Sequence, residues 1–232
     1  MIKYIRSNMR VIFFLFALCY SNLGNSSLSD VRTVTTSYNN IKLNGRLVIA
    51  AGNLANTKVI LLLHGTLGHY KMEIMEGLQS ALEERSINSL AINLSYGLHD
   101  RSGEMFDCKG PHIHKHQDAF DEIRAWINWL KAQGVTKIVL AGHSRGGNQI
   151  AWYAAENADA QVSKVVMIAP STWSETRTKE NYKKFHGVSL DDILQNAKKE
   201  ISRGNGATLI KKIGILYCKD TNVTPYTILS YY

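Results

Sequence analysis

The fold of this chain is decided by the stretch TKIVLAGHSRGGNQIAWYAA, residues 136–155, which predicts a strand, a sharp turn and a helix in succession. Residues 137–141 form a short apolar run rich in β-branched side chains, and residues 148–155 form an apolar, alanine-rich run. Between them Ser144 lies at the centre of a G-x-S-x-G pattern. Such a turn exposes the serine oxygen above the end of its strand, so Ser144 is a candidate nucleophile. The two flanking glycines fit, because side chains there would collide with the adjacent strand and helix.

A second motif, LLLHGT at residues 61–66, precedes this turn in the chain. Together with GHSRGG at residues 142–147 it resembles the α/β-hydrolase fold family, in particular its serine esterases and lipases, over roughly residues 41–170. The resemblance implies a serine hydrolase that acts on esters or related acyl compounds. A carboxylesterase-like enzyme of the EC 3.1 class is the expected activity, and no cofactor is implied.

The resemblance also implies an oxyanion hole made by two main-chain amides. The loop that begins at His64 corresponds to the family's oxyanion loop, and its donor is expected to be the N–H of Thr66. The second donor is the N–H of Arg145, immediately after the serine. We expect His64 itself to hold the loop in place rather than to act as the catalytic base.

Alternating strand-like and helix-like segments predict a doubly wound, mostly parallel sheet flanked by helices. Residues 58–63 are continuously apolar, which indicates a strand covered on both faces. The other expected strands are residues 31–37, 41–50, 89–94, 137–141 and 162–169. Amphipathic helices are expected around residues 72–85 and 120–130, and another at residues 190–201, where this family inserts a lid. We therefore expect a single hydrolase domain, residues 27–232, in which residues 171–232 form a lid-like or cap-like segment.

The first 26 residues read as a secretory signal peptide. Three basic residues and no acid precede a ten-residue apolar run at 11–20, and small polar residues follow it. The run is too short to span a bilayer comfortably, so export to the periplasm or the exterior is expected, with an uncleaved membrane anchor as the alternative. The net charge of +8 leaves +5 for the remainder of the chain, which indicates a solvated basic surface rather than a nucleic-acid site. The expected partner is a small-molecule acyl substrate, and the expected state is a monomer.

Three histidines, His112, His114 and His116, alternate just before Asp118 and raise the question of a metal site. Nothing else in the sequence supplies a clear ligand set, so we expect no metal there. A loop and helix start packed near the mouth of the active site is the better interpretation.

Two cysteines, Cys108 and Cys218, remain after removal of the signal peptide. In an oxidising compartment an even pair can form a disulfide. One hypothesis is a Cys108–Cys218 bridge that pins a late segment to the loop after the fourth strand. Two separate thiols are the alternative.

The triad acid and histidine that the resemblance implies are not found in the sequence. The last histidine, His186, precedes the lid-like helix, and no histidine follows Asp220. One explanation is a fragment cut before its last strands, with an exposed sheet edge, little activity and the acid and base beyond residue 232. The other is a complete protein without a full triad, which binds rather than cleaves, or which uses His186 with Asp191 or Asp192. We favour the fragment.

Overall fold

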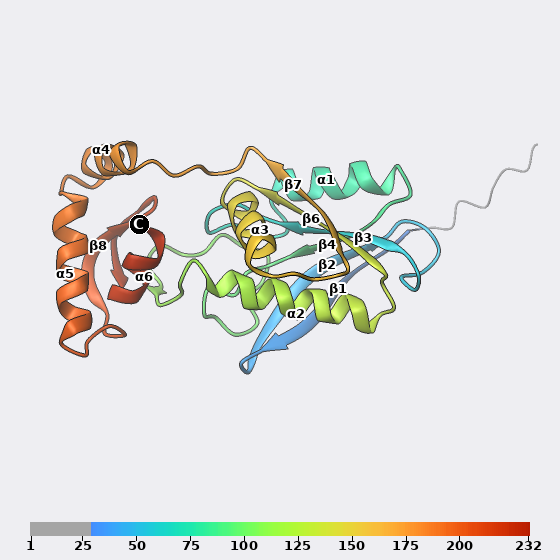
Figure 1. Ribbon diagram of the computed structural model, residues 1–232, viewed down its shortest axis with the longest axis horizontal. Helices are drawn as coiled ribbons and strands as arrows, with labels where there is room; N and C mark the ends of the chain where they lie inside the picture. The colour runs from blue at the N-terminus through green and yellow to red at the C-terminus, as the bar shows by residue number, and fades with distance from the viewer. Residues whose placement is uncertain (1–28) are drawn as a thin grey trace, which may run out of the picture.

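The computed structural model describes residues 29–232, so the predicted signal peptide lies outside the described residues. A six-stranded sheet runs in the order β1-β2-β4-β3-β6-β7 (Figure 1). Its strands are β1 (Asp30–Tyr38), β2 (Ile41–Ile49), β3 (Lys58–Leu63), β4 (Asn88–Ile92), β6 (Lys137–His143) and β7 (Val162–Ile168). Strands β4, β3, β6 and β7 pair in parallel, and β1 and β2 are antiparallel additions at one end. The expected mostly parallel sheet is confirmed.

Helices cover both faces of this sheet (Figure 1). Helix α1 (Glu73–Glu83) lies on one face, and α2 (Asp118–Ala132) and α3 (Arg145–Glu156) lie on the other. Alternate side chains of β3 explain the arrangement: Leu61 and Leu63 belong to the core beneath α2, whereas Leu62 belongs to the core beneath α1. All three leucines are buried, as expected for a continuously apolar strand.

The first hairpin also follows its local sequence. Asn39 and Asn40 connect β1 to β2 with φ values of 46° and 62°. Asparagine tolerates this left-handed region better than most residues, which is why two asparagines can close a tight turn between paired strands.

The segment after β7 forms a separate layer, the cap, residues 175–231, at one end of the molecule (Figure 1). It contains α4 (Glu175–His186), α5 (Leu190–Ser202), β8 (Ile210–Ile215), β9 (Cys218–Val223) and α6 (Pro225–Tyr231). Strand β9 pairs with β8 and with the short β5 (Pro111–His112), so a three-stranded sheet connects the cap to the body. The cap is thus only partly helical.

The cap ends in a helix that is not among the elements expected from the sequence. The sequence gives little indication of a helix in its last residues, yet α6 occupies Pro225–Tyr231. Thr224 caps it, because the Thr224 side chain accepts a hydrogen bond from the N–H of Thr227 at 3.2 Å. Pro225 stands at the first helical position, where its missing N–H costs no hydrogen bond.

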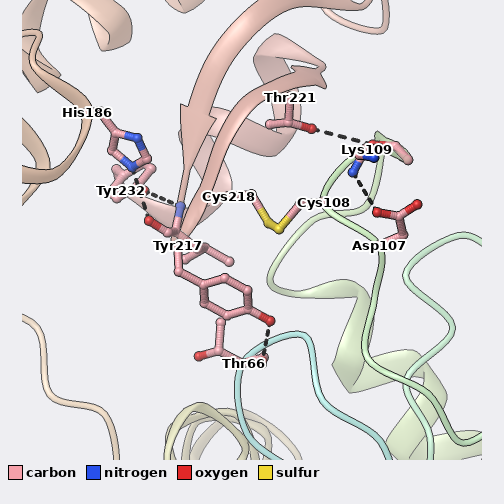
Figure 2. The surroundings of a disulfide bond; sticks show 11 residues. Thr66, Asp107, Cys108, Lys109, His186, Tyr217, Cys218, Thr221 and Tyr232 are labelled. Carbon is pink, nitrogen blue, oxygen red and sulfur yellow. Dashed lines mark hydrogen bonds between the residues drawn. A yellow bond between two sulfur atoms is a disulfide. The ribbon is translucent and has the colours of Figure 1, made fainter.

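A disulfide between Cys108 and Cys218 ties the first residue of β9 to the loop after β4 (Figure 2). The hypothesis of a bridge is therefore confirmed over the alternative of two thiols. A second contact in the same region is the bond that Thr221 donates to the carbonyl of Gly110 at 3.4 Å. Within residues 29–232, none of the helices has the length and apolar character needed to cross a bilayer.

Candidate functional site

Ser144 lies at the sharp turn between β6 and α3. Its backbone has φ 53° and ψ −120°, a strained conformation for a residue with a side chain. Two main-chain hydrogen bonds hold it: the Ser144 N–H donates to Ile168 at 3.0 Å, and the Ser144 carbonyl accepts from the N–H of Ser171 at 2.9 Å. Both partners come from the end of the neighbouring strand β7 or just beyond it. The expected strand, turn and helix are confirmed. The turn is held by hydrogen bonds to residues at and just after the end of β7.

The flanking glycines are explained by the space around them. A Cβ atom on Gly146 would lie 2.3 Å from the carbonyl oxygen of His64, and one on Gly142 would lie 2.5 Å from the backbone of Gly146. Gly65 also passes close to the serine, since a Cβ built on Gly65 would lie 3.3 Å from the Cβ of Ser144. The absence of side chains thus lets the loop after β3 approach the serine turn closely.

That loop is held by His64, which is fully buried. Its Nδ1 donates to the carbonyl of Gly65 at 2.8 Å, and its Nε2 accepts from the N–H of Leu94 at 3.2 Å. Burial lowers the pKa of His64 to about 3, so the ring is neutral at pH 7. Both nitrogens are occupied, which agrees with the expected role of holding the loop.

The two predicted oxyanion donors lie at the ends of adjacent strands. Thr66 follows β3 in a turn closed by the hydrogen bond from Gly68 N–H to Gly65 O, and Arg145 begins α3. A residue at the first position of a helix has no acceptor for its N–H within that helix. Within residues 29–232, neither amide donates a hydrogen bond to another protein group. The side chains do meet, because Arg145 Nε donates to Thr66 Oγ1 at 3.2 Å.

Two clefts flank Arg145. The first, of about 610 Å³, is named the aromatic cleft and is lined by Thr66, Arg145, Thr178, Asn181, Tyr182, Lys184, Phe185, His186, Leu216, Tyr217 and Tyr232. The second, of about 400 Å³, includes Ser171, Trp152 and Trp173 in its lining. Arg145 lines both, and Ser144, which is half-buried, lines neither. The predicted donor Thr66 is exposed to the aromatic cleft.

A buried polar layer supports the loop after β3. The guanidinium of Arg101 donates to the carbonyls of Leu94 at 2.9 Å and of Gly68 at 2.6 Å. Nearby, Glu122 accepts from both the N–H of Ser95 at 2.8 Å and its hydroxyl at 2.5 Å. Burial raises the pKa of Glu122 to about 7, although the two hydrogen bonds from Ser95 oppose the shift. These contacts fix the segment after β4 against the loop after β3.

The three alternating histidines are buried, and the rings of His114 and His116 pack edge to face against Tyr231 of α6. Burial lowers the pKa of His112 and His116 to about 4 and that of His114 to about 3. Neither ring nitrogen of His112 or His114 has a hydrogen-bond partner among the described residues. No set of three or more His, Cys, Asp or Glu side chains within residues 29–232 is arranged to hold a metal. The histidines are packing elements of the junction in this geometry.

Within residues 29–232 the structure does not assemble a triad of Ser144 and His186 with Asp191 or Asp192. His186 Nε2 bonds to the carbonyl of Leu216 at 3.1 Å, and Asp191 pairs with Lys179 at 2.9 Å. Within residues 29–232 no hydrogen bond joins His186 to Ser144, Asp191 or Asp192. His186 instead lines the aromatic cleft.

One site residue was missed by the sequence reasoning. The hydroxyl of Ser171 lies 3.2 Å from that of Ser144. The available signal was its position just after Pro170, where β7 ends beside β6, because the carboxyl ends of parallel neighbours meet at one edge of a sheet.

Comparisons with known proteins agree with this geometry. A family model described as alpha/beta hydrolase fold matches residues 58–187. Est1E from Butyrivibrio proteoclasticus has a similar structure, with a TM-score of 0.54, 17% identity, and coverage of 86% of this chain and 68% of that one. The Pyrococcus furiosus esterase Pf2001 gives a TM-score of 0.51 and 19% identity over 68% of this chain and 56% of its own. No curated protein sequence matches the chain.

Proposed function

Because this chain belongs to the α/β-hydrolase fold family, we propose that it is a serine hydrolase that cleaves ester or related acyl bonds. Ser144 is the nucleophile, and the amides of Thr66 and Arg145 form the oxyanion hole. The observation that carries the proposal is the backbone of Ser144, which is held at φ 53° on the end of β6 with the loop of Gly65 directly beside it. Strain of this kind persists where the surrounding structure enforces it, often at active sites.

The chemistry follows from where charge develops. Attack of the Ser144 oxygen on an acyl carbon forms a new C–O bond, passes the hydroxyl proton to a general base and places negative charge on the former carbonyl oxygen. Collapse of this intermediate expels the alcohol and leaves an acyl-serine, which water then hydrolyses. The amides of Thr66 and Arg145 stabilise that charge because neither donates to another protein group within residues 29–232. Ser171 orients the attacking hydroxyl in the resting state through its 3.2 Å contact.

A second candidate function is a binding protein on the same fold. The observation that favours it is that the Ser144 hydroxyl meets Ser171, and no histidine hydrogen-bonds to it within the described residues. Without a base the serine is a weak nucleophile.

Hydrolysis of p-nitrophenyl esters of graded chain length separates these two functions. A serine hydrolase gives a rate that depends on chain length and falls to background in Ser144→Ala. A rate that is flat across chain lengths, or that survives this substitution, supports the binding protein.

Export is part of the proposal. The Cys108–Cys218 disulfide suits an oxidising compartment, where such bonds persist. We propose that the chain is exported and acts as a monomer on a small acyl substrate, with residues 27–232 forming the hydrolase domain and the cap covering its site.

A further inference from the structure

The aromatic cleft has rings held in fixed positions. The Tyr182 hydroxyl donates to the carbonyl of Gly214 at 2.8 Å, and the Tyr232 hydroxyl accepts from the N–H of Leu216 at 2.7 Å. The two rings meet edge to face with centroids 5.4 Å apart. Tyr182 is buried and backs this wall, whereas Tyr232 is partly exposed, and its hydroxyl is fixed by its bond to the main chain. Such walls favour a flat, apolar ligand surface.

Tyr217 and Thr66 bring the loop after β3 to the same cleft. The hydroxyl of Tyr217 lies 3.5 Å from the carbonyl oxygen of Thr66, so a cap residue reaches across to the body (Figure 2). The disulfide at the neighbouring Cys218 fixes the base of that side chain (Figure 2). A ligand in the cleft therefore lies beside Thr66, whose amide we propose as an oxyanion donor.

The two charged side chains that line the cleft, apart from His186, are both cations. Arg145 and Lys184 line it, and none of the lining residues in the described part of the chain is an aspartate or glutamate. Both signs occur at the margin. Lys219 Nζ lies 4.6 Å from the ring centroid of Phe185. The charge of Asp220 opposes the lowering of the His186 pKa. A cleft whose lining carries positive but no negative charges favours an anionic ligand.

Among these cations, Arg145 is the one whose position is fixed for binding an anion. Its Nε–H bonds to Thr66, and its guanidinium lies 5.1 Å from the ring centroid of Tyr231, so two contacts hold its position. Within residues 29–232 its Nη groups have no hydrogen-bond partner, and no carboxylate lies within salt-bridge distance. A fixed guanidinium with unpaired N–H groups matches the two oxygens of a carboxylate.

We propose that the aromatic cleft binds an aromatic compound that carries a carboxylate, with its ring against the aromatic side chains that line the cleft and its carboxylate on Arg145. As a statement about substrate this rests on the proposed hydrolase function. The substrate is then an ester whose aromatic part bears a carboxylate separate from the bond that is cleaved. The binding itself is independent of catalysis.

The test is isothermal titration of the full chain, disulfide intact, with 2-naphthoate and with the neutral 2-naphthamide. These probes share a ring and differ in charge. Loss of a charge-assisted pair costs about 1.5–3 kcal/mol, so 2-naphthoate is expected to bind at least about tenfold more tightly. Equal affinities, or no binding of 2-naphthoate, would overturn the proposal. This comparison needs no variant, so a misfolded variant cannot obscure it.

Two neighbouring lysines provide a matched pair of variants. Lys184 lines the cleft, whereas Lys183, on the same helix and also exposed, does not. Lys184→Gln is expected to weaken 2-naphthoate binding by about twofold to fivefold, as for an exposed charge, and Arg145→Gln by about tenfold or more. Lys183→Gln is expected to leave it unchanged. Equal effects of the two lysine substitutions would mean attraction to general surface charge and would contradict the assignment.

The outcome is separable from that of the proposed function. If esters are cleaved through Ser144 but 2-naphthoate does not bind, only the ligand assignment fails. If 2-naphthoate binds as described but Ser144 does no chemistry, the hydrolase proposal fails and the cleft stands as a binding site.

Discussion

The side chain of Arg145 donates a hydrogen bond to Thr66 across the ends of β6 and β3, with 3.2 Å between Nε and Oγ1. These are the two residues whose amides form the proposed oxyanion hole. One hydrogen bond therefore links the loop that follows β3 to the helix that follows β6. Catalysis by preorganised donors depends on such fixed spacing, because the donors then need no rearrangement as charge develops.

Thr66→Val removes this link while it keeps the amide N–H and the shape of the side chain. A hydrogen bond of this kind contributes about 0.5–1.5 kcal/mol, so the reaction at Ser144 is expected to slow by about twofold to tenfold. The measurement is the rate at which a fluorophosphonate labels the serine. Thr66→Ser, which retains the hydroxyl, is the control and should react at nearly the original rate. A Val variant as fast as the Ser variant would show that the link does not matter.

Gly146→Ala is expected to destabilise the fold strongly. Its new Cβ would lie 2.3 Å from the carbonyl oxygen of His64, which is backbone and cannot turn aside. Overpacking of this kind costs about 1–3 kcal/mol or more, seen as a lower midpoint in urea unfolding. Gly77→Ala is the matched control, because nothing lies within 4 Å of a Cβ at that helical position. It should be neutral or stabilising by about 0.5–1 kcal/mol.

The sheet and the serine turn could be predicted because their signals are local. A few residues are enough to predict the continuously apolar strand β3. The same is true of the strand, turn and helix around Ser144. The role of His64 also follows from the chain, since a histidine directly after a buried strand has main-chain groups on both sides to bond.

Much of the cap and the finer contacts of the site could not be predicted, because they depend on distant partners. The helix expected at residues 190–201 is the exception and is present as α5. Helix α4 is mostly polar and buries only Tyr182, so it lacks the apolar periodicity that indicates a helix. The contact between Ser144 and Ser171 exists only because β7 lies beside β6. For α6 a signal did exist in Thr224 and Pro225, but it spans a single turn.

Loss of the disulfide is expected to loosen the cap. Cys108 and Cys218 are separated by 110 positions, and a closure of this length contributes about 2–5 kcal/mol. The double variant Cys108→Ser, Cys218→Ser should therefore unfold at lower urea than the parent. Peptide mapping without reduction should recover the two cysteines as one linked pair. Recovery of both as free thiols would contradict the bridge.

His114→Phe is expected to make the protein less sensitive to acid. The pKa of His114 is lowered from 6.5 to about 3 in the folded chain, so the unfolded chain binds more protons as pH falls below about 6.5. Because of this difference in proton binding, the free energy of unfolding falls by about 1–2 kcal/mol as the pH is lowered from 7 to 5. Phenylalanine keeps an aromatic ring at this buried position, where the His114 ring packs edge to face against Tyr231 with centroids 5.6 Å apart. Urea unfolding at both pH values measures the effect, and an unchanged difference would contradict it.

The most direct test of Ser144 as the nucleophile is labelling with a fluorophosphonate followed by peptide mapping. The probe reacts with an activated serine, so the phosphonylated peptide is expected to contain Ser144, and Ser144→Ala should remove the label. No label on the folded chain, or a label that persists in Ser144→Ala, would contradict the proposed hydrolase mechanism.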